Sequence, residues 1–339
     1  VPLYERIMEV AGDSQHLLIA SGDTLIMAPE IPDRLPDADV VCFGIWVEPH
    51  HASRHGVFFT PRDNPNRLEF MLQKPDHENI ERLSGSHLYL MDIGIWVLSD
   101  RAVDVLMQKS GYRGQGFQAG IPDFYDLYSA FGTALGSRPG NPDPEISPLT
   151  AAIIPLQHGE FYHYGTTGEL ISSSEKIQNR VLDQRTIWHT RIKPHPSLFV
   201  LNAITDIRWT QKHHHLWIEN SHVPASWELG SHHVITGVPQ NNWTLRLTDG
   251  TCLDLVPVGE KDWCIRPYGM EDAFRGKTAD PTTLWMGQPL ASWFEGRGIS
   301  LADAGLAGNE DIQSAPLFPV VDDPSREGDL VQWMVAPSP

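Results

Sequence analysis

Short apolar segments alternate with helical patterns over residues 1–171. Apolar residues recur at helical spacing in Arg101–Lys109, behind the possible N-caps Ser99 and Asp100, and again in Asp123–Leu135. The other segments are short and bounded by Gly, Pro, Asp or Asn, which is typical of buried strands. They are Leu17–Ala20, Val40–Val47, Gly56–Phe59, Leu68–Leu72, Leu88–Leu98 and Ala151–Leu156. This alternation predicts an α/β domain with a mainly parallel sheet and helices on both of its faces.

The pattern changes after this domain. Residues 172–192 are expected to form a linking helix, with Ile177, Val181, Leu182 and Ile187 on one side. Residues 193–270 contain strand-sized apolar runs separated by turn residues, which predicts an all-β unit, either a sandwich or a solenoid, without a regular hexapeptide repeat. Residues 271–339 are rich in Gly and Pro, with one helical stretch at Leu290–Phe294, and are expected to link or wrap the domains.

Composition narrows the class of protein. The 339 residues are 41% hydrophobic and 20% charged, as in a folded globular protein. The net charge of −18, without a cluster of basic residues, argues against nucleic acid or an anionic membrane as a partner. The longest apolar run, Val40–Val47, is far shorter than a membrane-spanning helix. Three cysteines fit neither a disulfide framework nor a zinc site, so we expect a reducing, cytoplasmic compartment.

Two charged residues follow predicted strands. Asp23 comes after the first strand and next to Gly22, where a carboxylate can bind Mg²⁺ shared with substrate phosphates. The alternative is that Asp23 caps a turn, since Gly-Asp is a common turn dipeptide. Lys74 ends a strand directly before Pro75, and its ammonium is a suitable partner for a phosphate. Taken alone, however, this stretch favours a solvated lysine at the end of a strand.

Three further motifs carry polar groups. Asp92 lies within an apolar strand, where it either borders a pocket and bonds a ligand, metal or backbone amides, or pairs with a cation. The segment Phe161–Thr167 ends in a glycine and hydroxyls that can contact a sugar or a phosphate, or begin a helix. The triplet His213–His215 is expected in an exposed loop, because adjacent side chains on a strand point to opposite faces and do not converge on one ion.

Several stretches of the sequence, taken together and in order, resemble the GDP-L-fucose pyrophosphorylase portion of the bifunctional L-fucokinase/GDP-L-fucose pyrophosphorylase family. The resemblance covers nearly the whole chain. The matching stretches are Leu18–Asp23, Asp39–Cys42, Phe70–Pro75, Met91–Trp96, Gly159–Thr166, Leu216–His222 and Ile235–Pro239.

The resemblance implies a nucleotidyltransferase-like α/β domain followed by a β-solenoid over residues 193–270. The implied reaction transfers GMP from GTP to L-fucose 1-phosphate and gives GDP-L-fucose and pyrophosphate, with Mg²⁺ as cofactor. By this likeness Asp23 is the metal-binding carboxylate and Lys74 holds the sugar phosphate. Gly165 and Thr166 line the far wall of the sugar site. We also expect Gly22, Asp92, Gly94 and His163 to belong to the substrate-binding residues.

The sequence also departs from the wider superfamily. His163 stands where an aspartate often completes the metal site, and imidazole is a poor ligand for Mg²⁺. Asp92 or Asp126 is then the second carboxylate, or one carboxylate suffices. A Gly-rich nucleotide loop is expected before Val1 and a kinase after Pro339. We therefore interpret the chain as the middle of a longer polypeptide that is incomplete as an enzyme by itself.

Two other functions fit parts of the sequence. One is a non-catalytic scaffold or sugar-phosphate-binding module attached to a kinase. The other is a β-solenoid acyltransferase with His222 or His232 as its base, which would need regular hexapeptide coils.

Overall fold

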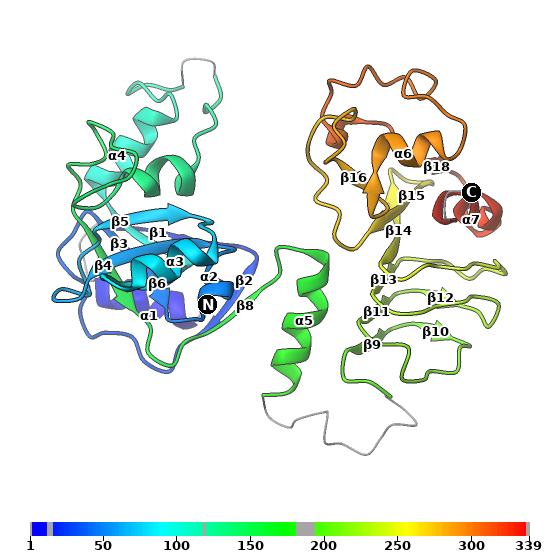
Figure 1. The fold of residues 1–339 in the computed structure, drawn as a ribbon, viewed down its shortest axis with the longest axis horizontal. Coiled ribbons are helices and arrows are strands. Elements are labelled where there is room, and N and C mark those ends of the chain that lie inside the picture. Colours follow the sequence, from blue (N-terminus) through cyan, green and yellow to red (C-terminus); the bar gives the residue numbers. More distant parts are fainter. Residues whose placement is uncertain (1, 12–15, 118–119, 181–193, 337–339) are drawn as a thin grey trace. The chain divides into compact units, whose positions relative to one another are not determined.

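The computed structural model describes residues 2–11, 16–117, 120–180 and 194–336 (Figure 1). The chain divides into two compact units, Val1–His163 and Tyr164–Pro339. The expected α/β domain and β-solenoid are both present. No helix of the described ranges is long and apolar enough to cross a membrane.

The first unit is built on one six-stranded sheet with the order β5-β4-β6-β3-β7, in which β1 also pairs with β6. A separate pair is formed by β2 and β8. The helices are α1 (Pro2–Ala11), α2 (Pro49–Ala52), α3 (His77–Ser84) and α4 (Asp100–Lys109), with the short turns η1 (Leu127–Phe131) and η2 (Gly132–Ala134). The strands are β1 (His16–Ala20), β2 (Thr24–Met27), β3 (Val40–Ile45), β4 (Gly56–Pro61), β5 (Phe70–Gln73), β6 (His87–Ser99), β7 (Ala151–Pro155) and β8 (Glu160–His163).

The prediction of a mainly parallel sheet is wrong. Only β3 and β7 run parallel among the pairings described for this sheet, and β6 is antiparallel to β1, β3 and β4. An uninterrupted apolar strand shows that both of its faces are buried, and this says nothing about the direction of its neighbours.

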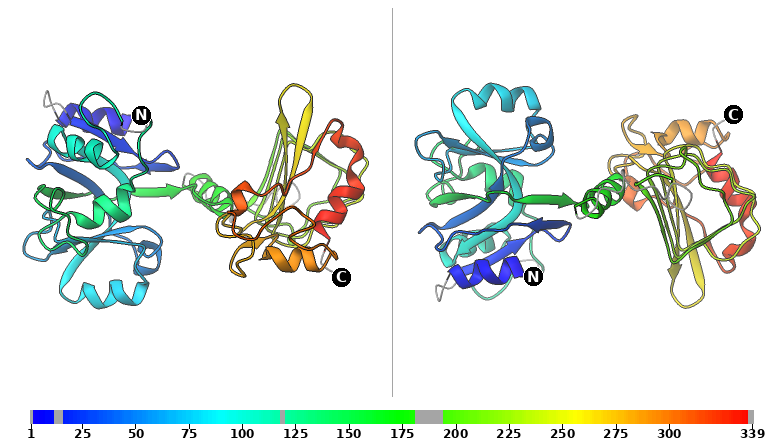
Figure 2. Two further views of the ribbon diagram at one scale, coloured as in Figure 1. Left: turned by 90° about the horizontal axis from the view of Figure 1, so that it is seen from above. Right: turned by 90° about the horizontal axis from the view of Figure 1, so that it is seen from below.

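Two hydrophobic cores, one on each face of the sheet, account for the apolar strands. On one face Ile7 of α1, Ala52 of α2 and Ile80 of α3 pack against alternate residues of β6. On the other face Ala102 of α4 and Phe131 of η1 pack against Trp96 and the remaining side of the strand. The expected covering of both faces by helices is therefore confirmed, and Figure 2 shows the helices around the sheet.

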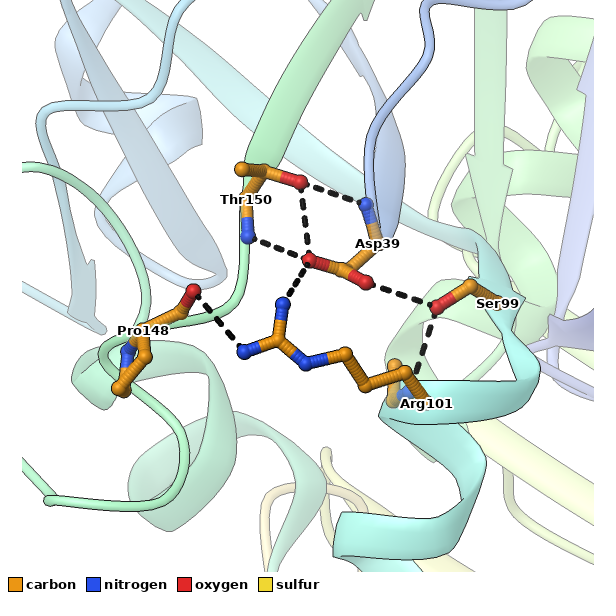
Figure 3. A network of polar contacts seen from close by, with 6 residues as sticks. Asp39, Ser99, Arg101, Pro148 and Thr150 are labelled. Carbon is orange, nitrogen blue, oxygen red and sulfur yellow. Dashed lines mark hydrogen bonds and ion pairs between the residues drawn. The ribbon is translucent and has the colours of Figure 1, made fainter.

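A polar network joins the starts of β3, β7 and α4 around Asp39 (Figure 3). Its Oδ2 accepts hydrogen bonds from Thr150 N at 2.9 Å and Thr150 Oγ1 at 3.0 Å, and lies 3.1 Å from Arg101 Nη1. Its Oδ1 accepts from Ser99 Oγ at 3.1 Å. Burial alone would raise the pKa of Asp39, but the donors from Thr150 and Ser99 and the Arg101 charge lower it below its ordinary value. The ionised network therefore stabilises this end of the sheet.

The second unit begins with α5 (Thr167–Gln178), and its main sheet has the order β18-β15-β14-β13-β11-β9. The predicted linking helix of residues 172–192 overlaps α5, but Val181, Leu182 and Ile187 lie outside the described residues. The strands are β9 (Leu198–Leu201), β10 (Ile204–Thr205), β11 (Leu216–Glu219), β12 (His222–Val223), β13 (His233–Thr236), β14 (Thr251–Val258), β15 (Asp262–Gly269), β16 (Leu284–Trp285), β17 (Gln288–Pro289) and β18 (Val320–Val321).

Parallel stacking of β9, β11, β13 and β14 makes this unit a solenoid of about three turns, not a sandwich (Figure 2). Paired residues in successive coils are 17 or 18 positions apart, as Leu198, Leu216 and His233 show. Each coil contributes apolar residues such as Ile218, Ile235 and Leu253 to a shared core. The coils therefore repeat in length and in burial, although their residues differ.

The C-terminal segment packs a core of its own. It contains the expected helix, α6 (Leu290–Glu295), as well as the turns η4 (Ile312–Ser314) and η5 (Pro324–Arg326) and the helix α7 (Gly328–Val335). Trp285, Trp293 and Phe294 form the centre of this core. Val331 and Val335 of α7 pack into the solenoid core, so this helix covers the solenoid interior.

Candidate functional site

A pocket of about 230 Å³ opens in the first unit, where β1, β5, β6 and β8 end or bend. It brings together five residues that the sequence indicated, Asp23, Lys74, Asp92, Gly94 and His163. The rest of its lining is Ser21, Thr24, Arg54, His55, Gly56, Gln73, Ile93, Tyr128 and Phe161.

Strand pairing places Asp23 beside His163. Because β2 pairs with β8 in the register Thr24–His163, the residue before β2 lies next to the end of β8. Asp23 Oδ2 is 3.3 Å from His163 Nε2, and 48% of the Asp23 side chain is exposed. The carboxylate therefore faces the pocket and remains accessible to a ligand.

Lys74 reaches the pocket from a strained backbone. Its φ is 47°, in the left-handed region that non-glycine residues rarely adopt. Lys74 N donates to His55 O at 3.0 Å, which holds the end of β5 against the loop before β4. The side chain is exposed and lines the pocket. A strained residue fixed at a pocket edge is a feature of functional sites.

A bulge in β6 positions Asp92 and Gly94. The register of β3 and β6 shifts between Cys42 and Gly44, so additional residues of β6 are accommodated there. Gly94 has a φ of 72°, and a Cβ at this position would lie 2.7 Å from the Cβ of Ser21. Only glycine fits this approach of β6 to the end of β1.

Asp92 is buried and borders the pocket. Its Oδ1 accepts from Gly94 N at 2.9 Å and from Trp96 Nε1 at 3.1 Å. Of the two alternatives for Asp92, the pocket-edge position with a backbone amide partner is therefore confirmed. Burial raises the pKa of Asp92 to about 7, and these hydrogen bonds oppose the rise.

Sequence reasoning missed Arg54, His55, Gln73 and Tyr128. Arg54 and His55 reach the pocket because Gly56 pairs with Gln73 across β4 and β5. Gln73 lines the pocket, and its buried Oε1 has no hydrogen-bond partner within the described part of the chain. The basic residues before Gly56 were a local signal, but only the strand register shows where they lie.

Three other predicted positions lie outside the pocket lining. Gly22 is exposed in the turn between Ser21 and Asp23. Gly165 and Thr166 belong to the second unit, and Thr166 Oγ1 caps α5 by accepting from Glu169 N at 3.3 Å. The alternative reading of this segment as a helix start is therefore confirmed, while the sugar-binding roles of Gly165 and Thr166 stay predictions.

The carboxylates near the pocket differ in whether they are free to hold a divalent metal ion. Mg²⁺ is usually held by one or two carboxylates together with water and substrate phosphates. Asp23 is open to the pocket, whereas Asp92 is occupied by its internal donors. Asp126, the other possible second ligand, instead caps η1 through Tyr128 N and Ser129 N at 2.8 and 2.7 Å. Asp23 is therefore the residue best placed to hold the ion.

An α/β unit with this pocket, followed by a β-solenoid, is the architecture that the sequence resemblance implied for a sugar nucleotidyltransferase. A model of the fucose pyrophosphorylase domain matches residues 146–323, a little over half of the chain. The chain belongs to this family. The pocket residues Asp23, Lys74 and Asp92 precede the matched segment.

The relatives differ greatly in how similar they are. An L-fucokinase/L-fucose-1-P guanylyltransferase of Bacteroides fragilis is 47% identical over 337 residues, covering 99% of this chain and 35% of that protein. The chain thus spans about a third of the relative's length. A solved structure described as mannose-1-phosphate geranyltransferase from Thermus thermophilus aligns with a TM-score of 0.40 and 13% identity, over 79% of this chain and 68% of that one. A likeness this remote supports no conclusion about this chain.

Proposed function

We propose that this chain is a fucose-1-phosphate guanylyltransferase module that converts GTP and L-fucose 1-phosphate into GDP-L-fucose and pyrophosphate. The observation that carries the proposal is the 47% identity, over nearly the whole chain, to a protein whose name includes this activity. The pocket supplies groups that such a reaction needs: a lysine, an arginine and an accessible carboxylate.

The chemical requirement is the neutralisation of two anionic substrates. A sugar phosphate and a triphosphate repel each other, so the attacking oxygen must be held in line with the α-phosphorus against this repulsion. We assign the binding of the sugar phosphate to the ammonium of Lys74, which the strained backbone holds at the pocket edge. Arg54 adds a second cation from the neighbouring loop.

We assign the metal to Asp23 and propose that it is Mg²⁺. When bound, the ion supplies charge stabilisation at the phosphate oxygens. His163 orients the Asp23 carboxylate by its contact at 3.3 Å. We assign to the side-chain amide of Gln73, whose oxygen has no hydrogen-bond partner within the described residues, a contact with a sugar hydroxyl after rotation toward the pocket.

We also propose that the chain is joined to a kinase domain, as the relative's name and length imply. An attached fucokinase would supply the sugar phosphate that this pocket uses. The cysteines Cys42, Cys252 and Cys264 are free of disulfides, and we propose a reducing, cytoplasmic compartment for the protein.

The test is pyrophosphate release from GTP and L-fucose 1-phosphate, by this chain and by a kinase-linked polypeptide that contains it. Release should require both substrates, and mannose 1-phosphate serves as the matched sugar control. Binding of fucose 1-phosphate without turnover in either protein would instead establish the non-catalytic module. Hydrolysis of an acyl-CoA without pyrophosphate release would establish the acyltransferase, which the comparisons do not favour.

A further inference from the structure

Three histidine side chains meet at one corner of the solenoid. His214 and His215 precede β11, and His232 precedes β13 in the next coil. Backbone hydrogen bonds stack these coils: His232 N donates to His214 O, and His233 N donates to His215 O, each at 3.1 Å. One ring nitrogen of each histidine lies within 4.8 Å of those of the other two.

The rings face one another closely. His215 and His232 are stacked, with centroids 4.6 Å apart and planes at 4°. His214 stands at a steep angle to both, at 5.1 Å from His215 and 5.3 Å from His232. The Nδ1 atoms of His214 and His215 are 2.8 Å apart. All three side chains are half-buried, so the cluster is sheltered but accessible to solvent.

The backbone explains how neighbouring histidines converge. His215 and His232 have φ values of 55° and 61°, in the left-handed region. This conformation breaks the alternation of an extended strand and turns His215 toward His214. The segment lies outside helices and strands, as expected for a loop, but the expectation that it is exposed is wrong. His213 is also not exposed: it is 3% accessible, and its Nδ1 accepts from Thr210 N at 2.8 Å.

A supporting layer holds the cluster in place. Ser197 is fully buried, and its Oγ accepts from His215 N at 2.7 Å while it contacts His195 Nδ1 at 2.7 Å. The ring of His195 lies 5.4 Å from that of His214. Ser197 therefore fixes the backbone of His215 and links it to the ring of His195.

We propose that His214, His215 and His232 bind a divalent transition-metal ion such as Zn²⁺. Imidazole suits zinc, copper or nickel and is a poor ligand for Mg²⁺. Zinc–nitrogen bonds of about 2.0–2.1 Å in a tetrahedral site place the ligand nitrogens roughly 3.3 Å apart. This value lies between the 2.8 Å of the His214–His215 pair and the 4.8 Å limit of the cluster. The nitrogens are therefore close enough to share an ion once the stacked rings of His215 and His232 rotate to direct their in-plane lone pairs at it.

Three protein ligands leave a fourth position for water. The cluster belongs to the second unit and shares no residue with the pocket of the first.

The test is a Zn²⁺ titration of the chain after chelator treatment, in competition with a chromophoric chelator. We expect one equivalent to bind, and His214→Gln and His232→Asn each to weaken it by roughly 10- to 100-fold or more. Asn tolerates the left-handed backbone at position 232. His77→Gln, an exposed histidine of α3, is the control and should bind as the parent does.

Equal Zn²⁺ affinity in the unaltered chain, His214→Gln, His232→Asn and His77→Gln would overturn the proposal. The visible spectrum of Co²⁺ bound to the unaltered chain gives a second measurement that needs no variant. Intense bands of four-coordinate cobalt support the site, and the weak spectrum of six-coordinate cobalt overturns it.

Discussion

Replacing Lys74 by Ala removes the ammonium that we assign to the phosphate of fucose 1-phosphate. A charge-assisted contact is worth about 1.5–3 kcal/mol, which corresponds to roughly a 10- to 150-fold loss of affinity. Lys74 is exposed, so water and salt screen its charge and the lower part of this range applies. We therefore expect the apparent affinity for fucose 1-phosphate to fall about tenfold, while that for GTP changes little.

The strained backbone at Lys74 requires its own control. Ala at a φ of 47° is strained much as Lys is, whereas Gly is not. Lys74→Gly should therefore lose the same affinity as Lys74→Ala and be at least as stable to unfolding. Lys261→Ala, at an exposed lysine in the turn between β14 and β15, changes the net charge equally and should leave the kinetics unchanged.

Steady-state kinetics over both substrates separates the possibilities. The assignment of Lys74 is refuted if fucose 1-phosphate dependence stays within about twofold of the parent in both variants. It is also refuted if Lys74→Gly restores the affinity that Lys74→Ala loses, because the backbone would then be responsible.

Three other substitutions test the remaining carboxylates. Asp23→Asn should lower kcat at saturating substrates by at least roughly tenfold, and excess Mg²⁺ should restore part of it; indifference to Mg²⁺ would contradict the metal role. Asp92 has a folded-state pKa of about 7, above its unfolded value, so its burial destabilises the fold increasingly as pH rises from about 4 to 7. The free energy of unfolding of Asp92→Asn, measured with urea in EDTA, should rise relative to the parent by up to about 4 kcal/mol as the pH increases across that window. A difference that stays constant with pH would show that Asp92 does not titrate there. Asp39→Asn should lower the free energy of unfolding by about 2–3 kcal/mol near neutral pH, because the donors of Thr150 lose a charged acceptor. The control Asp37→Asn, at an exposed residue, should lower it little. The pKa of Asp39 is lowered in the folded state, so the difference in free energy of unfolding between the parent and Asp39→Asn should vanish as the pH falls through this pKa. A difference that does not depend on pH would contradict a stabilising role for the ionised carboxylate.

The pocket residues predictable from the sequence are those whose placement depends on one strand alone. Asp23 and Lys74 each stand within three residues of the end of an apolar run, and Asp92 interrupts one. Each was therefore visible as a polar residue near or within a buried strand. Arg54 and His55 were not predictable in this way. They reach the pocket only because Gly56 pairs with Gln73. The pairing register of two strands depends on both strands, so the residues of one strand do not determine it.

The error in strand direction has the same origin. Nine of the 13 residues of β6 are buried, on both faces of the strand, because cores form on both sides of the sheet. That burial explains the apolar run completely. Parallel and antiparallel partners produce the same run when both faces are covered, so pairing had to come from the structure.

The solenoid and the histidine cluster share a signal that hexapeptide matching does not detect. Strand residues such as Leu198 and Leu216 pair at an interval of 18 positions, and His214 and His232 are separated by the same interval. A residue type that recurs once per coil is stacked upon itself, whatever the intervening residues are. The spacing that builds the coils therefore also brings the histidines together. A search at the length of a whole coil would have predicted both the solenoid and the contact between His214 and His232, and the left-handed turn at His215 is the part that only the structure supplies.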